Sequence, residues 1–276
     1  MKDSARITWD ADNVFTGTAW YYARYRPGYP DEVIKLLVDK FKLRKNSRAL
    51  DLGCGTGQVA LALAPHVSEV IAIDPLEAML KEARALASVK KITNIIWLPG
   101  EAKNLKSMAS EIGEIDITVI ARAFHWMDRT QTLHDLYQIT RPEGGLAIIA
   151  DSGLLYQPTT PWKEIIDETV KLWIGEERKA GTTGTYTHPG KHHQEILEKS
   201  DFKNVELAEI QTERTWSIDQ IIGYIYSTSS TSLPVLGDKK EPFEEDLRNR
   251  LKKLEPAGHF KEQVTVRMMM CRKPVE

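Results

Sequence analysis

The segment DLGCGTG, residues 51–57, constrains the fold more than any other part of the sequence. Its three alternating glycines follow the apolar stretch SRALDL and precede QVALALAP. SRALDL has the pattern of a short buried strand, and QVALALAP has that of a short helix that Pro65 closes. A strand, a glycine turn and a helix in this order are typical of the nucleotide-binding half of an α/β sheet. The segment therefore predicts a nucleotide-like ligand at the carboxyl end of the first strand.

Helix and strand patterns then alternate from residue 31 to residue 152. Predicted helices cover residues 31–41, 58–65, 75–87 and 129–140, and predicted strands cover 47–52, 69–74, 94–100, 115–124 and 146–152. Such alternation predicts a mostly parallel sheet with helices on both faces. Ligands of these sheets bind at the carboxyl ends of the strands, where the sequence places Asp51, Asp74, Glu101 and residues 123–126.

The second half of the chain is less regular. Helical patterns cover residues 161–175, 193–202, 217–229 and 243–255, and strand patterns cover 204–217 and 263–273. We expect residues 1–30, rich in aromatic residues and arginine, to form a lid segment and residues 31–276 to form one α/β domain. A cap inserted over the carboxyl edge of the sheet is expected at about residues 153–200 and 226–242.

The glycine turn discriminates between two classes of nucleotide ligand. Dinucleotide-binding turns have the pattern G-x-G-x-x-G, and this chain has Gln58 at the third glycine position. Asp51 would also repel a pyrophosphate. S-adenosylmethionine carries an ammonium and a sulfonium group instead, so Asp51 can face its amino acid part. Asp74 suits the ribose hydroxyls, and Glu101 with Ala102 is placed to border the adenine.

Four segments resemble the class I S-adenosylmethionine-dependent methyltransferases, namely ALDLGCGTG, AIDPLEAML, PGEAKNL and the strand unit around RPEGGLAII. The resemblance implies a Rossmann-like seven-stranded sheet in the order 3-2-1-4-5-7-6, with the last strand antiparallel. It also implies cofactor contacts at Asp51, Gly53, Asp74, Ala102 and the end of the fourth strand. YARYRPGYP, AFHWMD and WSIDQIIGYIYSTSS further resemble the trans-aconitate methyltransferase-like small-molecule group (methyltransferase type 11), although Met127 replaces an aromatic residue of that pattern.

From these patterns we predict a complete set of site residues. The predicted cofactor-binding residues are Tyr25, Arg26, Asp51, Gly53, Cys54, Gly55, Gly57, Asp74, Pro75, Met79, Glu101, Ala102, Ala121, Ala123, Phe124 and Trp126. The predicted substrate-binding residues are Trp20, Tyr21, His125 and Tyr224. His125 is the candidate catalytic residue, as a general base or as a positioning group. Arg24 and Arg26 are candidates for pairing with a carboxylate of the cofactor or of an acidic substrate.

Composition limits the other function classes. The net charge is −2 without a Lys/Arg block, which disfavours a nucleic-acid substrate because phosphates require a basic face. Two cysteines and the loop residues His188, His192 and His193 lack metal-ligand spacing, so we expect no metal. The polar N-terminus and the lack of an apolar run of about 20 residues suggest a cytoplasmic protein without membrane contact, as a monomer or homodimer.

The predicted function is methyl transfer from S-adenosylmethionine to a small molecule, with a carboxylate or hydroxyl oxygen as the favoured acceptor. The alternatives are N- or C-methylation of a small metabolite, a nucleic-acid or protein methyltransferase, a protein that binds the cofactor without catalysis, and a nicotinamide oxidoreductase.

Overall fold

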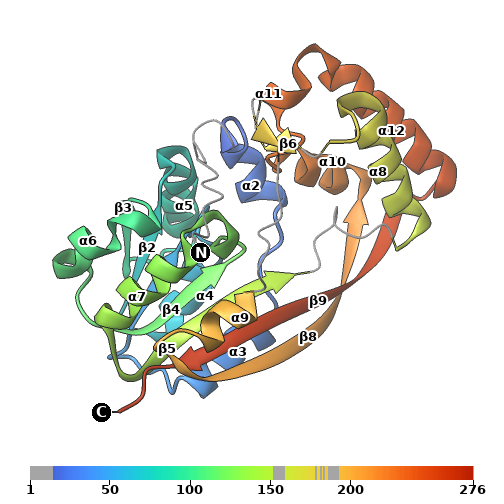
Figure 1. Ribbon diagram of the computed structural model, residues 1–276. Helices are drawn as coiled ribbons and strands as arrows, with labels where there is room; N and C mark the ends of the chain where they lie inside the picture. The colour runs from blue at the N-terminus through green and yellow to red at the C-terminus, as the bar shows by residue number, and fades with distance from the viewer. Residues whose placement is uncertain are drawn as a thin grey trace.

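The main sheet has seven strands in the order β3-β2-β1-β4-β5-β9-β8 (Figure 1). The computed structural model describes residues 15–151, 159–177, 179–180, 182, 184–185 and 193–275. The strands are β1 (Arg48–Leu52), β2 (Glu69–Asp74), β3 (Ile95–Pro99), β4 (Ile115–Ala121), β5 (Thr140–Asp151), β8 (Lys203–Ser217) and β9 (His259–Arg272). The first five are parallel, and β9 is antiparallel to both of its neighbours. The predicted fold class and strand order are therefore confirmed.

Helices follow the strands in alternation through the first half of the chain. The α-helices are α2 (Ala19–Tyr25), α3 (Asp31–Lys40), α4 (Gln58–Leu63), α5 (Glu77–Val89), α6 (Leu105–Ile112), α7 (Arg129–Ile139), α8 (Pro161–Ile174), α9 (His193–Glu198), α10 (Ile218–Tyr226), α11 (Leu233–Leu236) and α12 (Lys240–Leu254). The short elements are the 3₁₀ turns η1 (Ala64–His66), η2 (Ala102–Asn104), η3 (Phe124–Trp126) and η4 (Gly237–Lys239), and the strand pair β6 (Lys179–Ala180) with β7 (Gly184–Thr185).

Three helices, α2, α6 and α11, have no counterpart among the helices predicted from the sequence. Each spans at most eight residues, which is too short for a clear helical period. In α6 the apolar Leu105, Met108 and Ile112 share one face of a helix that stops at Gly113. Tertiary packing of such a face stabilises a short helix that propensity alone does not specify.

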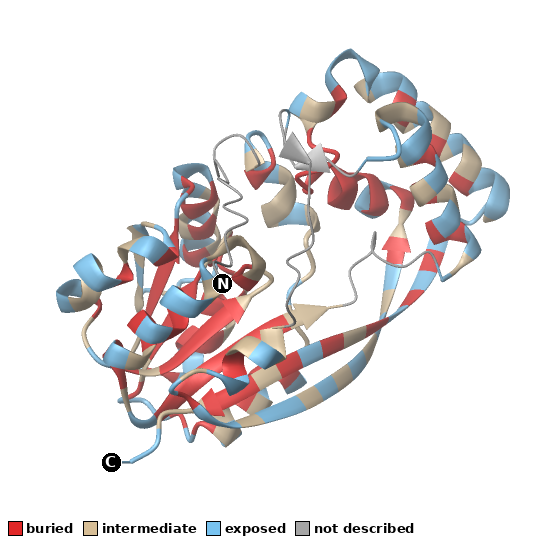
Figure 2. Cartoon of the chain, viewed as in Figure 1, coloured by how far each residue is buried: buried red, intermediate tan, exposed pale blue. Residues whose placement is uncertain are grey.

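Successive side chains of the strands point to two different cores, as the pleat of a strand requires. In β1, Ala49 packs with α3, α4 and α5 on one face of the sheet, and Leu50 packs with α6, α7 and α9 on the other. The central strands are buried almost throughout (Figure 2). This double burial explains why β4 has an almost continuous apolar sequence.

A third core lies beyond the sheet, where α8, α10, α11 and α12 pack together to form the cap (Figure 1). The long strands β8 and β9 reach from the sheet into this cap, so that Trp216 and Phe260 pair within the cap core. A nearly buried ion pair of Lys163 with Glu262, at 2.7 Å, fixes α8 to β9. The indole of Trp216 also donates a hydrogen bond to Glu262, at 2.8 Å.

The predicted cap boundaries, residues 153–200 and 226–242, lie partly outside the described residues and remain a prediction. Within the described part, α8 belongs to the cap core, whereas α9 packs on the sheet through Leu197. None of the described helices is both long enough and apolar enough to cross a lipid bilayer.

Helix α2 lies between the sheet domain and the cap (Figure 1). On one side Arg24 forms an ion pair with Glu82 of α5, at 2.9 Å. On the other side the ring of Tyr25 packs directly on Gly223 of α10, where a Cβ would come within 2.3 Å of the ring. The described part of the predicted lid segment therefore bridges the two halves of the molecule.

Candidate active site

The glycine turn is pressed against the ends of three strands. The backbone N–H groups of Gly53 and Cys54 both donate to the carbonyl of Ile73 in β2, at 2.8 and 3.0 Å. Gly53 has a φ of 75°, and a Cβ at this position would lie 2.5 Å from the Cβ of Ala123, just after β4. Only glycine permits this conformation and this close approach. The turn is thus held at the carboxyl ends of β1, β2 and β4.

Asp51 presents a buried carboxylate with one unpartnered oxygen. The residue is only 1% exposed. Its Oδ2 accepts a hydrogen bond from the backbone N–H of Ala60 at 2.9 Å, and its Oδ1 has no partner among the described residues. Burial, with a smaller effect of the Asp74 charge, raises the pKa of Asp51 to about 7. Because a buried polar atom without a partner is costly, this oxygen suits a cationic donor such as an ammonium group.

Asp74, the last residue of β2, has both of its oxygens turned to backbone donors. Its Oδ1 accepts from the N–H of Leu76 at 3.0 Å, and its Oδ2 accepts from the N–H of Gly55 at 2.8 Å. Burial raises the pKa of this carboxyl group. Each carboxylate oxygen has a second lone pair, so Asp74 can also accept hydrogen bonds from two ribose hydroxyls.

Glu101 and Ala102 follow β3 and begin η2. Glu101 and Asn104 form reciprocal capping hydrogen bonds, and the Glu101 carboxylate also pairs with Lys103 at 2.8 Å. Ala102 is buried, whereas Glu101 is exposed. The side chain of Glu101 therefore caps η2. The backbone of Glu101 and Ala102, rather than the Glu101 side chain, is the candidate for bordering an adenine.

The end of β4 leads through Ala121 and Ala123 into η3. Phe124 is buried in the sheet core and lies edge-on to His193, with ring centroids 5.1 Å apart. His125 is half-buried beside the ring of Trp126, at 4.8 Å, and Trp126 also contacts Phe15 at 5.5 Å. The structure thus gathers the predicted residues of this segment beside the glycine turn, with Phe124 directed to the core.

Three further predicted cofactor residues lie around the same turn. Cys54 is buried, and burial raises the pKa of its thiol well above the usual range. Pro75 is exposed after β2. Met79 is buried between α5 and α2, where Tyr22 packs beside it. The ring of Tyr22 also covers Gly55, at 3.6 Å from the position that a Cβ would take there. Helix α2 therefore lies over the glycine turn.

Arg26, which follows α2, is bound to the cap. Its guanidinium donates to the hydroxyl of Ser227 at 2.7 Å and to the hydroxyl of Tyr224 at 3.2 Å. It also stacks on the rings of Tyr22 and Tyr224, at 4.9 and 4.4 Å from their centroids. Tyr224 is only 2% exposed. Both predicted site residues thus join α2 to α10 beside the glycine turn.

The other residues of α2 face different surroundings. Trp20 is 46% exposed and carries the Arg24 guanidinium on its ring, at 4.2 Å. Tyr21 contacts the ring of Tyr226 edge-on, at 5.2 Å, on the cap side. Of the predicted substrate-binding residues, Tyr21 and Tyr224 lie against the cap, and Trp20 lies at the surface.

The sequence analysis missed a charged cluster at the carboxyl ends of β4 and β5. Arg122 follows β4 with a φ of 54°, which is uncommon for a residue with a side chain. Its guanidinium lies 3.5 Å from Asp151, the last residue of β5, and Arg214 of β8 reaches the same carboxylate at 3.4 Å. Burial would raise the pKa of Asp151, but Arg122, Arg214 and Arg26 together lower it. The sequence signal of this cluster is an arginine after one apolar strand and an aspartate at the end of the next.

A run of hydroxyl side chains was missed as well. Residues 227–232, STSSTS, connect α10 to α11, and each is at most 9% exposed. Such complete burial of six Ser and Thr residues is unusual for a connecting segment. One hydroxyl of this run, that of Ser227, accepts a hydrogen bond from Arg26 at 2.7 Å.

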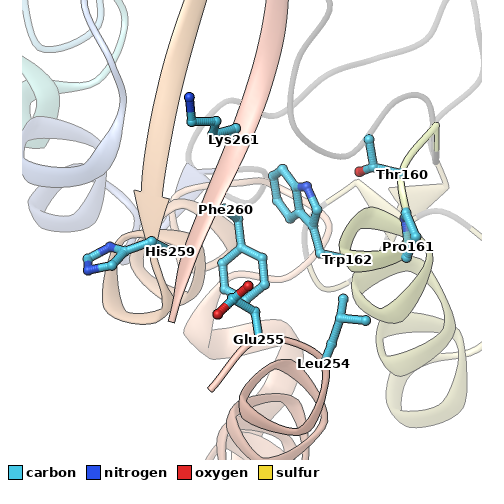
Figure 3. A pocket seen from close by; sticks show the side chains of 8 residues that line it. All are labelled: Thr160, Pro161, Trp162, Leu254, Glu255, His259, Phe260 and Lys261. Atoms are coloured by element: carbon cyan, nitrogen blue, oxygen red, sulfur yellow. The ribbon is translucent and has the colours of Figure 1, made fainter. Parts of the chain in front are cut away.

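A hollow of about 410 Å³ lies elsewhere, at the base of the cap (Figure 3). It is lined where α8 begins, α12 ends and β9 begins, by residues that include Trp162, Glu255 and His259. None of its lining residues belongs to the glycine turn or to the carboxyl ends of the central strands. It is therefore separate from the candidate active site.

No group of three or more His, Cys, Asp or Glu side chains that could hold a metal ion occurs among the described residues. His193 begins α9, and the predictions for His188 and His192 concern residues outside the described ones.

Comparison with known proteins agrees with the geometry of the turn. Residues 49–144, which contain most of β1, the glycine turn and β2 to β4, match the family model described as a methyltransferase domain. An uncharacterized methyltransferase of Schizosaccharomyces pombe is 26% identical over 88% of both chains. A second protein of that yeast, named methyltransferase-like, is 29% identical over 57% of this chain and 56% of its own length. A probable S-adenosylmethionine-dependent methyltransferase of Saccharomyces cerevisiae is 35% identical over 46% of this chain and 43% of its own.

The chain thus spans about half the length of two of these three relatives and most of the other. Among solved structures, a protein of Anaeromyxobacter dehalogenans that is provisionally named a type II methyltransferase has a similar fold. Its TM-score is 0.61 with 19% identity, and the match covers 91% of this chain and all of that one. The sheet order and the glycine turn thus agree with the match of residues 49–144 to a methyltransferase domain, and the chain is similar to S-adenosylmethionine-dependent methyltransferases.

Proposed function

We propose that the protein transfers the methyl group of S-adenosylmethionine to an oxygen atom of a small-molecule acceptor, either a carboxylate or a hydroxyl. The observation that carries this proposal is the unpartnered Oδ1 of Asp51 beside the glycine turn. An ammonium group would satisfy this oxygen, and S-adenosylmethionine has such a group whereas a pyrophosphate does not.

The residues of the turn fit the rest of this cofactor. Asp51 would hold the ammonium group, Asp74 the ribose hydroxyls and the backbone near Ala102 the adenine. Gly53 and Gly55 would let the backbone approach the ligand closely, since neither has a side chain. When bound, the cofactor supplies a methyl group that is activated by its sulfonium charge.

What the protein adds to the reaction is mainly positioning. Holding donor and acceptor in near-attack geometry can contribute roughly 7–11 kcal/mol. A hydroxyl acceptor must also lose a proton, and His125 is the candidate base for this step because it lies next to the end of β4. A carboxylate acceptor needs no base, and His125 would then position the acceptor.

A small acceptor is favoured because α2 and the cap cover the glycine turn. Tyr22 lies over Gly55, and Arg26 closes the other side of Tyr22 against Tyr224. The net charge of −2 gives no overall attraction to nucleic acid. The narrower resemblance to the trans-aconitate methyltransferase-like group remains a prediction.

The proposal is tested by incubating the protein with methyl-labelled S-adenosylmethionine and a metabolite extract, followed by mass spectrometry. We expect a labelled product whose formation is strongly reduced with the Asp51→Asn variant. Lability of the label to mild base would identify a methyl ester, and a stable label on oxygen would identify an ether. A label on nitrogen or carbon would contradict the acceptor assignment, and cofactor binding without any product would contradict methyl transfer.

Once a product is known, the His125→Gln variant separates the two roles of His125. A base role predicts a lower kcat and loss of the acid limb of the pH–rate profile, because the ionisable imidazole is gone. A positioning role predicts mainly a higher KM with an unchanged pH profile.

A further inference from the structure

The cluster at the ends of β4 and β5 carries more positive than negative charge. Arg26, Arg122 and Arg214 are always ionised, because a guanidinium does not lose its proton in proteins. The one carboxylate that they share is that of Asp151, whose pKa they lower. Among the residues that the structure describes, three cations around one anion leave an excess of two positive charges.

This charge excess is largely buried. The side chains of Arg122 and Arg214 are each 15% exposed, and that of Asp151 is 3% exposed. Nε of Arg122 is buried and has no partner among the described residues. Buried charges without partners are costly, so such an arrangement persists where a ligand or another compensation offsets it.

The contacts that the arginines make with Asp151 leave donors free for a ligand. At 3.5 and 3.4 Å, the two ion pairs are longer than the usual 2.7–3.2 Å of an N–H···O hydrogen bond. Arg214 uses another N–H for the carbonyl of Gly28, at 3.3 Å. Since a guanidinium has five N–H donors, Arg122 and Arg214 can each bind a further anion.

The cluster also adjoins the site of the cofactor. Arg122 directly precedes Ala123, whose Cβ fills the space beside Gly53. Arg26 stacks on Tyr22, which in turn covers Gly55. In addition, Arg122 holds a φ of 54°, and strained backbone of this kind is concentrated at binding and catalytic sites.

We propose that Arg122 and Arg214, supported by Arg26, bind a carboxylate of the methyl acceptor, so that the substrate is an organic acid. The planar fork of an arginine matches a carboxylate with two parallel hydrogen bonds. The cofactor also has a carboxylate, but one such group would neutralise only one of the two excess charges. The inference rests on the proposed methyl transfer and names the class of its acceptor.

The test is a calorimetric titration of the full chain, saturated with S-adenosylhomocysteine, with acetate, succinate and benzoate at constant ionic strength. Their uncharged amides serve as the matched ligands. We expect at least one of the carboxylates to bind and none of the amides. We also expect Arg122→Gln and Arg214→Gln to weaken this binding at least tenfold, with Arg214→Lys retaining part of it.

The control variant is Arg267→Gln on β9, because Arg267 pairs with Glu209 at an exposed position of the same sheet. Circular dichroism and thermal unfolding show whether each variant is folded. The test can be read if either Arg122→Gln or Arg214→Gln is folded. The proposal is overturned if no carboxylate binds the wild-type complex, or if the glutamine variants bind as the wild type does.

A second pair of titrations identifies the source of the carboxylate. S-adenosylhomocysteine carries a carboxylate, and methylthioadenosine does not. If Arg122→Gln weakens binding of the former and not of the latter, the cluster binds the cofactor and the acceptor assignment is wrong. If Arg122→Gln binds S-adenosylhomocysteine and methylthioadenosine as the wild type does, the acceptor assignment is supported. Failure of the wild type to bind S-adenosylhomocysteine would instead contradict the proposed function itself.

Discussion

The carboxylate of Asp51 accepts a hydrogen bond from the backbone N–H of Ala60 through only one of its oxygens, at 2.9 Å. This contact fixes the orientation of the side chain, because Ala60 belongs to α4, which follows the glycine turn. The second oxygen is buried without a partner among the described residues. The hydrogen bond from Ala60 therefore holds the Asp51 carboxylate so that its second oxygen forms a preformed site for one cationic group.

Replacing Asp51 by asparagine removes the charge and preserves the size of the side chain. We expect the variant to bind S-adenosylhomocysteine about ten- to a hundredfold more weakly, since a hydrogen bond to a charged group contributes about 1.5–3 kcal/mol. Isothermal titration calorimetry measures the change. The matched control is Asp39→Asn, at an exposed position of α3, which should bind as the wild type does. Equal affinities for the two variants would contradict the role of Asp51.

Binding of S-adenosylhomocysteine should depend on pH through Asp51. Its pKa is about 7 without ligand, and only the ionised carboxylate attracts an ammonium group. Affinity should therefore rise as the pH increases through 7 and should fall by about tenfold per unit well below it. Titrations from pH 5.5 to pH 8 test this, with Asp51→Asn as the variant that should lack the dependence. A wild-type affinity that is flat or falls with rising pH would be inconsistent with this mechanism.

Gly53→Ala tests the close packing of the turn. The new Cβ would meet the Cβ of Ala123 at 2.5 Å in a backbone conformation with a φ of 75°, so we expect a loss of about 1–3 kcal/mol of unfolding free energy. Gly28→Ala is the control, because a Cβ at that position meets no atom within 4 Å, and it should change stability by less than about 0.5 kcal/mol. Denaturant unfolding of both variants decides between these values.

Arg24 and Arg26 should contribute unequally, although only one residue separates them. Arg26→Ala removes hydrogen bonds to Ser227 and Tyr224, and we expect a loss of about 1.5–3 kcal/mol in stability. Arg24→Ala removes an exposed ion pair with Glu82, which is worth about 0–1 kcal/mol. Thermal or denaturant unfolding compares them. A larger effect of Arg24→Ala would show that α2 is held by the sheet domain rather than by the cap.

The sheet could be predicted from the sequence because its signals are local. Each of β1 to β4 is a short apolar segment bounded by a turn or helix signal, and the pattern alone placed Asp51 and Asp74 at strand ends. The predicted strand 146–152 covers only the apolar end of β5, because the polar residues TRPEGG that begin this strand have the pattern of a turn. The parallel arrangement follows from the alternation of helices and strands, and the strand order follows from the family resemblance. The same locality explains the predicted position of His125 after β4.

The rest of the site depends on contacts between distant parts of the chain. Arg122 follows β4, whereas Asp151 belongs to β5 and Arg214 to β8, and no spacing rule joins the three residues. Helix α2 is too short for periodicity, and its position is set by Gly223, which only the folded structure brings to Tyr25. Phe124 was predicted to line the site, but its burial depends on α9.

The assignment of every site residue depends on the identity of the ligand that the glycine turn binds. The most direct measurement is a calorimetric titration of the full chain with S-adenosylhomocysteine and, separately, with NADH. We predict saturable one-site binding of S-adenosylhomocysteine and no binding of NADH. Binding of NADH, or no binding of S-adenosylhomocysteine, would contradict the account.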